Sequence, residues 1–234
     1  MLISGIEKFT LLDYPGKTAC IVFTPGCNFR CPYCHNSEFV LPDKIARLRN
    51  SFIQEDIFFN FLKQRIGLLE GVVISGGEPT LMGDLKEFII KVKNLGFCVK
   101  LDTNGSNPNA VSALIQDKLI DCIAMDIKAP LERYNQIAGR EIDISKITES
   151  IALILESPIE YEFRSTVAQG LHDESDILKM AELIPGAKNY YLQNFRSSET
   201  LLDLSLKGRQ GFSQEFLEQA TQKCLKYVQK CYIR

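Results

Sequence analysis

Several signals that mark special classes of protein are missing from this sequence of 234 residues. It has no run of about eighteen apolar residues, so we expect no membrane-spanning helix. Its opening residues lack a basic stretch followed by an apolar one, so we expect no export and a cytoplasmic location. The formal net charge is only −2, which predicts no bulk attraction to nucleic acid or to anionic membranes. Without internal repeats or low-complexity segments, the ordinary apolar content predicts one globular domain with a sizeable core.

Histidine is scarce, with two residues, whereas there are eight cysteines. In a chain that is not exported, cysteines are mostly reduced thiols or metal ligands. Three of them, Cys27, Cys31 and Cys34, share one loop, TPGCNFRCPYCHN, with the spacing C-x3-C-x2-C. Thiolates are soft ligands, and close spacing lets one loop deliver several of them to one metal centre. On a four-iron cluster, three cysteines would leave one iron without a protein ligand and open to a substrate.

Three other interpretations of this loop remain open. A structural zinc site would recruit His35 as a fourth ligand, although a ligand directly after Cys34 strains a tetrahedral site. The stretch CPYCH also matches the haem attachment pattern C-x-x-C-H, a chemistry of exported proteins. A thioredoxin-like C-x-x-C pair would leave Cys27 unexplained. The spacing therefore favours an iron–sulfur cluster.

Apolar stretches of strand length alternate with helical patterns along the chain. We expect strands at 3–10, 18–23, 71–75, 97–101, 121–126, 161–167 and 190–195, and helices at 55–69, 85–95, 110–119, 145–156 and 175–184. Such alternation predicts an α/β fold with a parallel sheet and right-handed crossovers. Six repeating units are too few for a closed eightfold barrel, so we expect a partial (β/α)6 barrel, open on one side.

The predicted single domain has a core at about 18–195, an N-terminal strand extension at 1–17 and a C-terminal loop and helix at 196–234. A C-terminal amphipathic helix is expected at 212–232, capped by Ser213, and Ser145 is expected to cap the helix at 145–156. The polar connection at 196–210 fits a lid or, more commonly, a mobile surface loop.

Polar residues stand where nearly every predicted strand ends, which is where parallel α/β folds bind ligands. Gly76 and Gly77 let the backbone approach a ligand closely, and the Glu78 carboxylate can accept hydrogen bonds from an ammonium group. Lys128 and Arg164 are cations suited to a carboxylate, although either alone also fits a salt bridge at the barrel rim. The other strand-end groups are Asp102, Asn104, Asp126 and Gln193–Asn194.

The C-x3-C-x2-C loop, with the aromatic Tyr33 before its last cysteine, resembles the radical S-adenosylmethionine (radical SAM) superfamily. The wider context, DYPG at 13–16 followed by VFTPGCNFRCPYCHN, is similar to the activating enzymes of glycyl-radical enzymes. Among these it looks most like the long form of the anaerobic ribonucleoside-triphosphate reductase activating proteins. The resemblance extends from Gly5 to about Phe195.

The resemblance implies a site made of three groups of residues. Cys27, Cys31 and Cys34 would hold a [4Fe-4S] cluster, and Gly76, Gly77 and Glu78 would match the motif that holds the SAM amine. Asp126, Lys128 and Arg164 would meet the SAM carboxylate, Asp102 and Asn104 would face its ribose and methionine, and Tyr33 would touch the adenine. The resemblance also allows a monovalent cation at Asp102 and Asp126. Asn36 would bond near the cluster or simply cap a turn.

The activity that the resemblance implies is reductive cleavage of SAM to a 5'-deoxyadenosyl radical. That radical would take a hydrogen atom from a glycine of anaerobic ribonucleotide reductase, with flavodoxin or ferredoxin as the external electron donor. No residue is needed as a general base. The alternatives are an activase of another glycyl-radical enzyme, a radical SAM enzyme acting on a small molecule, and a zinc-stabilised interaction module.

The remaining cysteines, aromatic residues and histidine have ordinary structural interpretations. Cys20, Cys98 and Cys122 lie in apolar strands and are expected to behave as small core residues. Cys224 and Cys231, seven residues apart, would share one face of the last helix. His172 is expected at the surface, and Phe58, Phe59 and Phe61 in the core.

Overall fold

Residues 1–234 are described by a computed structural model, and their contacts group them into two units. The first unit comprises Met1–Asn28, Glu38–Thr103 and Asn109–Ile123, and the second comprises Phe29–Ser37, Asn104–Pro108 and Ala124–Arg234. The predicted division into core, extension and tail stays a prediction. None of the helices combines the length and apolar character that crossing a bilayer requires.

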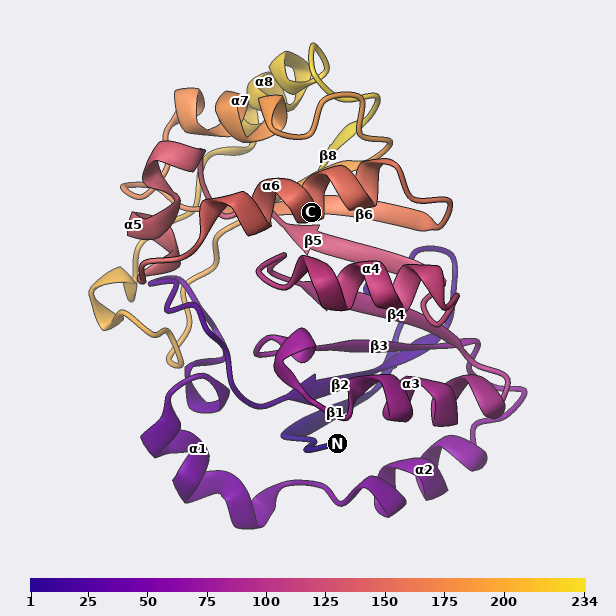
Figure 1. Ribbon diagram of the computed structural model, residues 1–234. Coiled ribbons are helices and arrows are strands. Elements are labelled where there is room, and N and C mark those ends of the chain that lie inside the picture. Colours follow the sequence, from indigo (N-terminus) through magenta and orange to yellow (C-terminus); the bar gives the residue numbers. More distant parts are fainter. The chain divides into compact units, whose positions relative to one another are not determined.

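Four strands form the sheet of the first unit (Figure 1). β1 (Gly5–Thr10) runs antiparallel to β2 (Ala19–Thr24), which is parallel to β3 (Gly71–Gly76), which in turn is parallel to β4 (Cys98–Thr103). Asp121 donates its amide to the carbonyl of Val99. The next residue begins β5 (Cys122–Asp126), whose first residues belong to this unit and whose last residues belong to the other. β2, β3 and β4 are almost wholly buried, as their unbroken apolar runs predicted.

The helices of the first unit are α1 (Pro42–Leu48), which the sequence reading missed, α2 (Glu55–Lys63), α3 (Leu85–Asn94) and α4 (Pro108–Gln116). The helix predicted at 55–69 was too long. After Lys63 the amides of Gln64 and Arg65 bond three residues back, and Gly67 then adopts a φ of +80°, which a helix cannot continue through. α3 ends as predicted, just before Gly96 at a φ of +88°.

The core of the first unit contains several residues that the sequence placed there. Tyr14, from the DYPG turn, packs with Ala19, Ile21, Val73 and Cys122 in one buried cluster. Cys20 is also fully buried, whereas Cys98 lies at the edge of this cluster. Phe58 is buried as expected, while Phe59 and Phe61 are only half-buried around it.

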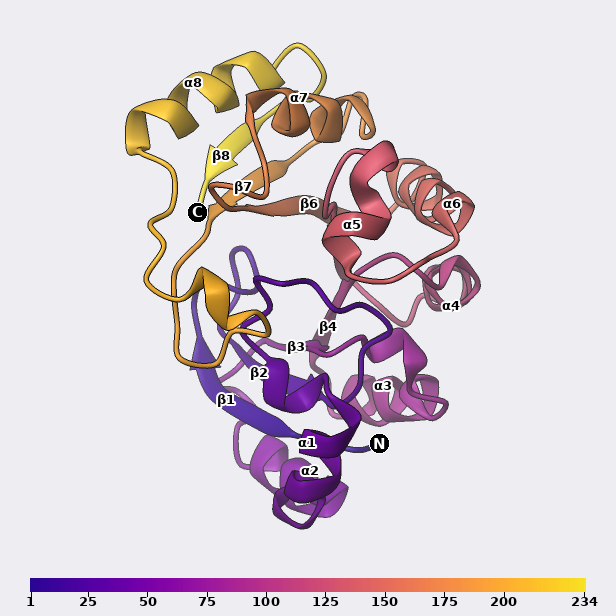
Figure 2. The same ribbon diagram turned by 90° about the vertical axis from the view of Figure 1, so that its left-hand side faces the viewer.

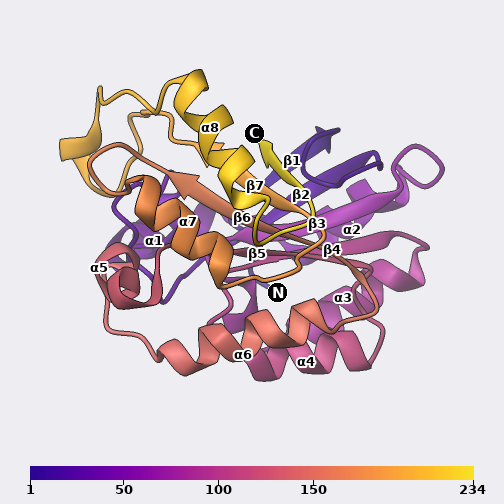
Figure 3. The ribbon, with the colours of Figure 1, turned by 90° about the horizontal axis from the view of Figure 1, so that it is seen from above.

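The second unit continues the alternation of strands and helices. Ile127, after β5, donates its amide to Arg164 of β6 (Glu160–Val167), and β6, β7 (Tyr190–Asn194) and β8 (Cys231–Ile233) pair in parallel in that order. Its helices are α5 (Tyr134–Ala138), α6 (Ile144–Leu155), α7 (Glu174–Glu182) and α8 (Gln214–Cys224). α8 packs against both α7 and β8, as Figures 2 and 3 show.

The helix predicted at 212–232 was wrong in its second half. Ser213 does cap α8, accepting from the Phe216 amide, but the helix ends at Cys224. Beyond it, backbone groups of residues 227, 229 and 230 bond to residues 186–190, which draws the chain into the unpredicted strand β8. Cys224 and Cys231 therefore lie on different elements. The predicted Ser145 cap was also wrong, because Asp143 caps α6 and accepts from the Ser145 amide.

Candidate functional site

The cysteine loop, residues 24–36, contains no disulfide, so all three of its cysteines are reduced thiols. Cys27 belongs to the first unit, and Cys31 and Cys34 belong to the second. Burial raises the pKa of the Cys31 thiol to about 11, partly opposed by the charge of Lys128. Burial also raises the pKa of Cys34, whose thiol accepts the backbone amide of Asn36. Metal binding would have to displace these protons, as it does at any thiolate site.

The second unit holds its part of the cysteine loop from two directions. The amides of Leu202 and Asp203 donate to the carbonyls of Cys34 and Pro32, at 3.0 Å each. The connection at 196–210, called the tail segment here, is therefore tied to the cysteine loop by backbone hydrogen bonds. On the other side, the Arg30 amide donates to the carbonyl of Ala138 at 2.6 Å.

Tyr33 supplies a polar atom without a partner. Its residue is 4% exposed, and its buried hydroxyl forms no hydrogen bond. Burial raises the pKa of this phenol well above its usual value. An unpaired buried hydroxyl is costly, by about 1–3 kcal/mol, unless a ligand supplies its partner. This atom therefore fits a position beside a bound ligand.

His172 is buried, at 5% exposure, and the surface position predicted for it was wrong. Its Nδ1 accepts the Ala168 amide at 3.2 Å, so Nε2 carries the proton and donates to the Lys128 carbonyl at 2.9 Å. Burial lowers the pKa of its imidazole, which favours the neutral form. The centre of its ring lies 6.0 Å from that of Tyr33. His172 therefore lies beside Tyr33 and bonds to Lys128, two predicted site residues.

The turn after β3 explains why two glycines stand before Glu78. A Cβ atom at Gly76 would lie 2.3 Å from the backbone nitrogen of Thr24, and one at Gly77 would lie 1.8 Å from the carbonyl oxygen of Gly26. The Gly77 amide donates to Thr24 and the Glu78 amide to Gly26, at 2.8 and 2.7 Å. The absence of side chains therefore lets this turn lie directly against the start of the cysteine loop.

Glu78 is fully buried, and three donors fix its position. Its Oε1 accepts from the amide and hydroxyl of Thr80, at 3.1 and 2.6 Å, and from the hydroxyl of Thr103 at 2.8 Å. A buried carboxylate held this way is preorganised to accept a cationic group.

Two neighbouring predicted residues have different surroundings. Asp102, on β4, accepts from Lys100 Nζ at 2.7 Å, and the Lys100 side chain is fully buried. The sequence reading missed Lys100, although a lysine two positions from a candidate carboxylate in a buried strand points to the same face. Asn104, in the second unit, accepts the Ser106 amide at 2.9 Å and so shapes the turn after β4.

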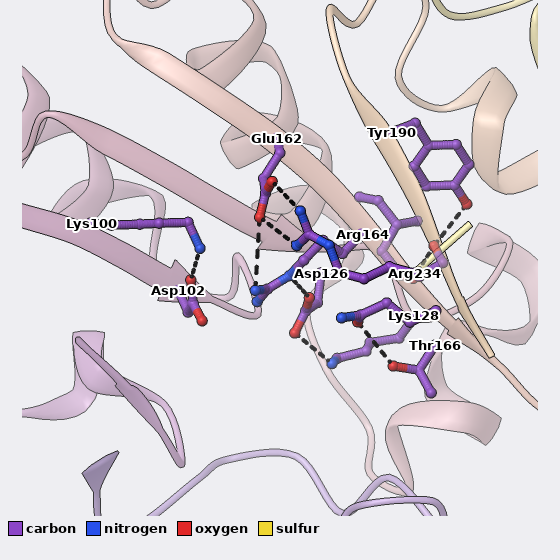
Figure 4. A network of polar contacts seen from close by, with 12 residues as sticks. Lys100, Asp102, Asp126, Lys128, Glu162, Arg164, Thr166, Tyr190 and Arg234 are labelled. Atoms are coloured by element: carbon purple, nitrogen blue, oxygen red, sulfur yellow. Dashed lines mark hydrogen bonds and ion pairs between the residues drawn. The ribbon is translucent and has the colours of Figure 1, made fainter. Parts of the chain in front are cut away.

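The second unit gathers Asp126, Lys128, Glu162, Arg164 and Arg234 into one charge network (Figure 4). Lys128 Nζ and Arg164 Nε both donate to the Asp126 carboxylate, at 2.9 Å each. Burial alone would raise the pKa of Asp126, but Arg164 and Lys128 hold it well below its usual range. Burial alone would lower the pKa of Lys128, but Asp126 raises it. The predicted carboxylate-binding residues are therefore together and charged.

No three histidine, cysteine, aspartate or glutamate side chains gather closely enough to hold a single metal ion. An iron–sulfur cluster is larger and binds each thiolate through a different iron. The reduced thiols of the cysteine loop and the unpaired Tyr33 hydroxyl fit a cluster with a bound ligand.

Comparisons with known proteins agree with these features. A model of the radical SAM superfamily matches residues 21–184. The chain is 37% identical to a candidate glycyl-radical enzyme activating enzyme of Methanocaldococcus jannaschii, covering 85% of this chain and 81% of that protein. It is 28% identical to the pyruvate formate-lyase-activating enzyme of Streptococcus mutans, covering 80% and 73%. It is also 26% identical to a candidate GTP 3',8-cyclase of Methanococcus aeolicus, covering 86% and 71%.

Solved structures share the fold. SuiB of Streptococcus suis bound to S-adenosylmethionine superposes with a TM-score of 0.64 and 14% identity, covering 92% of this chain and 51% of that one. This chain thus spans about half the length of the SuiB chain. At this identity the likeness shows the fold alone, and it confirms the α/β fold with parallel strands that the sequence predicted.

Proposed function

Because this chain belongs to the radical SAM superfamily, in the branch of the glycyl-radical-enzyme activating enzymes, we propose that it acts on an anaerobic ribonucleoside-triphosphate reductase. The enzyme class and its two cofactors, a [4Fe-4S] cluster and SAM, follow from the family. The choice of target rests on one observation, the resemblance of DYPG and VFTPGCNFRCPYCHN to the activases of this reductase. The reductase, as the glycyl-radical partner, would receive the radical, and an external donor such as flavodoxin or ferredoxin would supply the electron.

Cys27, Cys31 and Cys34 would hold the cluster, leaving one iron open. When bound and reduced, the cluster supplies the electron that splits SAM into methionine and a 5'-deoxyadenosyl radical. The protein contributes ligation, orientation and burial. The low exposure of Cys31 and Tyr33 keeps water from this part of the loop, and the tail segment holds it from outside through Leu202 and Asp203.

SAM would be oriented by charge at both ends of its methionine. Glu78, fixed by Thr80 and Thr103, would accept hydrogen bonds from the amine, and the glycine turn would let that amine approach. Lys128 and Arg164, held by Asp126, would attract the carboxylate. Asp102 and Asn104 would face the ribose and methionine, and Tyr33 would lie against the adenine. No side chain has to move a proton, and we assign no general base.

The core of the proposal is tested by anaerobic purification, iron and sulfide analysis and a reductive SAM-cleavage assay. We expect about four irons per chain and formation of 5'-deoxyadenosine, both lost in Cys31→Ala. Cys98→Ala is the matched control, because Cys98 lies on β4 outside the cysteine loop. A colourless protein that holds zinc and does not cleave SAM would contradict the proposal.

The choice of target needs a second assay. The reconstituted enzyme is incubated with SAM and, separately, with an anaerobic ribonucleotide reductase and a pyruvate formate-lyase from the same source. We expect the electron paramagnetic resonance signal of a glycyl radical on the reductase and none on the lyase. The reverse result would assign another branch of activases.

The similarity to a candidate GTP 3',8-cyclase favours one competing function, radical chemistry on a small molecule. Such an enzyme would use the same cluster and SAM groups with a different substrate. Conversion of a nucleoside triphosphate during SAM cleavage, in the absence of any protein partner, would support this alternative over the activase.

A further inference from the structure

A buried histidine connects the segments that follow two neighbouring strands. Ala168 comes directly after β6, and His172 closes the turn that follows. The His172 amide donates to the Ala168 carbonyl at 3.0 Å, and the ring Nδ1 accepts the Ala168 amide at 3.2 Å. Both backbone groups of Ala168 are therefore bonded to His172, which fixes the direction of the imidazole ring.

The turn that carries His172 is also anchored at its other end. α7 begins just after it behind a capping box, in which Asp173 and Asp176 exchange bonds between side chains and backbone amides. Arg133 donates to the carbonyl of Leu171 at 2.9 Å and pairs with the Asp176 carboxylate. The ring of His172 therefore stands on a fixed turn and can hold another group in place.

The remaining ring nitrogen of His172 is directed at the backbone of Lys128. Because Nδ1 accepts a hydrogen bond, Nε2 carries the proton and donates to the Lys128 carbonyl at 2.9 Å. On the other side, the Lys128 amide donates to the Tyr134 hydroxyl at 3.4 Å. With its amide and its carbonyl both bonded, Lys128 has a fixed backbone orientation, and this sets the direction in which its side chain leaves the chain.

The side chain of Lys128 ends where a ligand can reach it. Its Nζ donates to the Asp126 carboxylate at 2.9 Å, and the two side chains keep 15% and 24% of their surface exposed (Figure 4). An ammonium group carries more N–H bonds than this one contact uses. A ligand carboxylate can therefore bind Lys128 without breaking its pair with Asp126.

Tyr33 indicates a ligand at the same place. The centre of its ring lies 6.0 Å from that of His172, and its buried hydroxyl forms no hydrogen bond. Burial raises the pKa of this phenol and the charge of Lys128 opposes the rise, so that charge acts close to the hydroxyl. A buried donor without a partner is expected where a ligand supplies one.

We propose that His172 is a positioning residue for SAM binding, which holds the Lys128 carbonyl and thereby directs the Lys128 side chain at the SAM carboxylate. The proposal rests on the proposed function, which assigns Lys128 to that carboxylate. His172 does not touch the ligand in this scheme; it acts through Lys128.

The test uses two substitutions that each keep one of the two ring contacts. The side-chain nitrogen of glutamine stands as many bonds from Cβ as Nε2 of histidine, and the side-chain oxygen of asparagine stands as many as Nδ1. His172→Gln therefore keeps the donor to Lys128, whereas His172→Asn keeps the acceptor for the Ala168 amide. SAM affinity is measured in anaerobically reconstituted protein, with decarboxylated SAM as a second ligand that keeps the amine and the sulfonium.

His172→Asn is expected to weaken SAM binding about tenfold, close to the loss of one hydrogen bond to a charged group, and to leave decarboxylated SAM nearly unaffected. KM for SAM should rise while kcat stays near its original value, and His172→Gln should keep most of the affinity. If His172 only stabilises its turn, the affinity for both ligands will fall alike, in step with the melting temperature of the ligand-free variants. That result would overturn the proposal.

A second background, Lys128→Met, shows whether His172 acts through Lys128. There His172→Asn should weaken SAM binding no further, because the cation that it directs is gone. If the two effects add, His172 acts by another route, and the proposal is overturned while the proposed function stands. If Lys128→Met binds SAM as tightly as the original protein, the assignment of Lys128 to the carboxylate in the proposed function is wrong, and this proposal falls with it.

Discussion

Gly77 is the position where a single methyl group should damage the site most. A Cβ atom there would lie 1.8 Å from the carbonyl oxygen of Gly26 and 2.5 Å from its carbonyl carbon. The obstacle is backbone, which cannot turn aside as the end of a flexible side chain can. The Gly77 and Glu78 amides also pin this turn to Thr24 and Gly26. Gly77→Ala must therefore push the start of the cysteine loop away from β3.

The cost can be worked from these contacts. Overpacking by one carbon in a tight site costs about 1–3 kcal/mol. Losing the 2.7 Å hydrogen bond from Glu78 to Gly26 adds about 1 kcal/mol. A loss of roughly 2–4 kcal/mol lowers the melting temperature of a chain of this size by roughly 5–15 °C. Because the displaced segment leads directly to Cys27, cluster content and SAM cleavage should fall together.

The assay compares Gly77→Ala with Gly83→Ala, measuring thermal unfolding of the metal-free protein and iron content after reconstitution. Gly83 is a matched control, because a Cβ atom there meets nothing within 4 Å. We expect the control to keep its stability and its iron. If Gly77→Ala matches the control in both measurements, the close approach of the two turns is not what requires a glycine, and the reasoning fails.

Three further predictions concern buried polar groups. Asp126→Asn is expected to lower the free energy of unfolding by about 3 kcal/mol near pH 7, since it removes the negative charge to which Lys128 and Arg164 both donate. Because the Asp126 pKa is depressed by folding, its contribution is present above the unfolded pKa of about 3.9 and is lost as the pH falls through the folded value, so urea titrations should show the variant's deficit shrinking only below about pH 4. Tyr33→Phe should leave the ligand-free protein as stable as before or more so, by up to about 1 kcal/mol, and a melting temperature well below the original would mean that the hydroxyl is paired. Lys100→Met should cost about 3 kcal/mol by removing the cation that donates to the buried Asp102, and Lys100→Met with Asp102→Asn should recover part of it in the same denaturation assay.

The local sequence was sufficient to predict most of the strands and the cysteine loop. An unbroken apolar run such as 19–23 is buried on both faces wherever it lies in a parallel sheet, so its burial as a strand follows from its own residues. The spacing of Cys27, Cys31 and Cys34 and the pair of glycines before Glu78 are equally local. Each of these features lies within one turn or one strand, so the sequence could indicate them before any packing was known.

Where the sequence reading failed, the deciding partner lay far away in the chain. The second half of the helix predicted at 212–232 does not form, because backbone groups of residues 227, 229 and 230 form hydrogen bonds with residues 186–190. The chain then continues into strand β8. His172 follows a polar stretch that reads as surface, yet its ring is buried against the carbonyl of Lys128. Neither periodicity nor composition carries such information.

The sequence by itself determined the enzyme family and every strand except β8, because motif spacing and apolar runs are properties of short segments. Only the tertiary structure decided which charges meet. Arg164 meets Asp126 across 38 positions because Ile127, directly after β5, donates its amide to the carbonyl of Arg164 on β6. Arg234 meets Glu162 across 72 positions because β8 adds to the sheet beside β7, and the free energy of a partly buried ion pair depends on that placement and not on the sequence between its members.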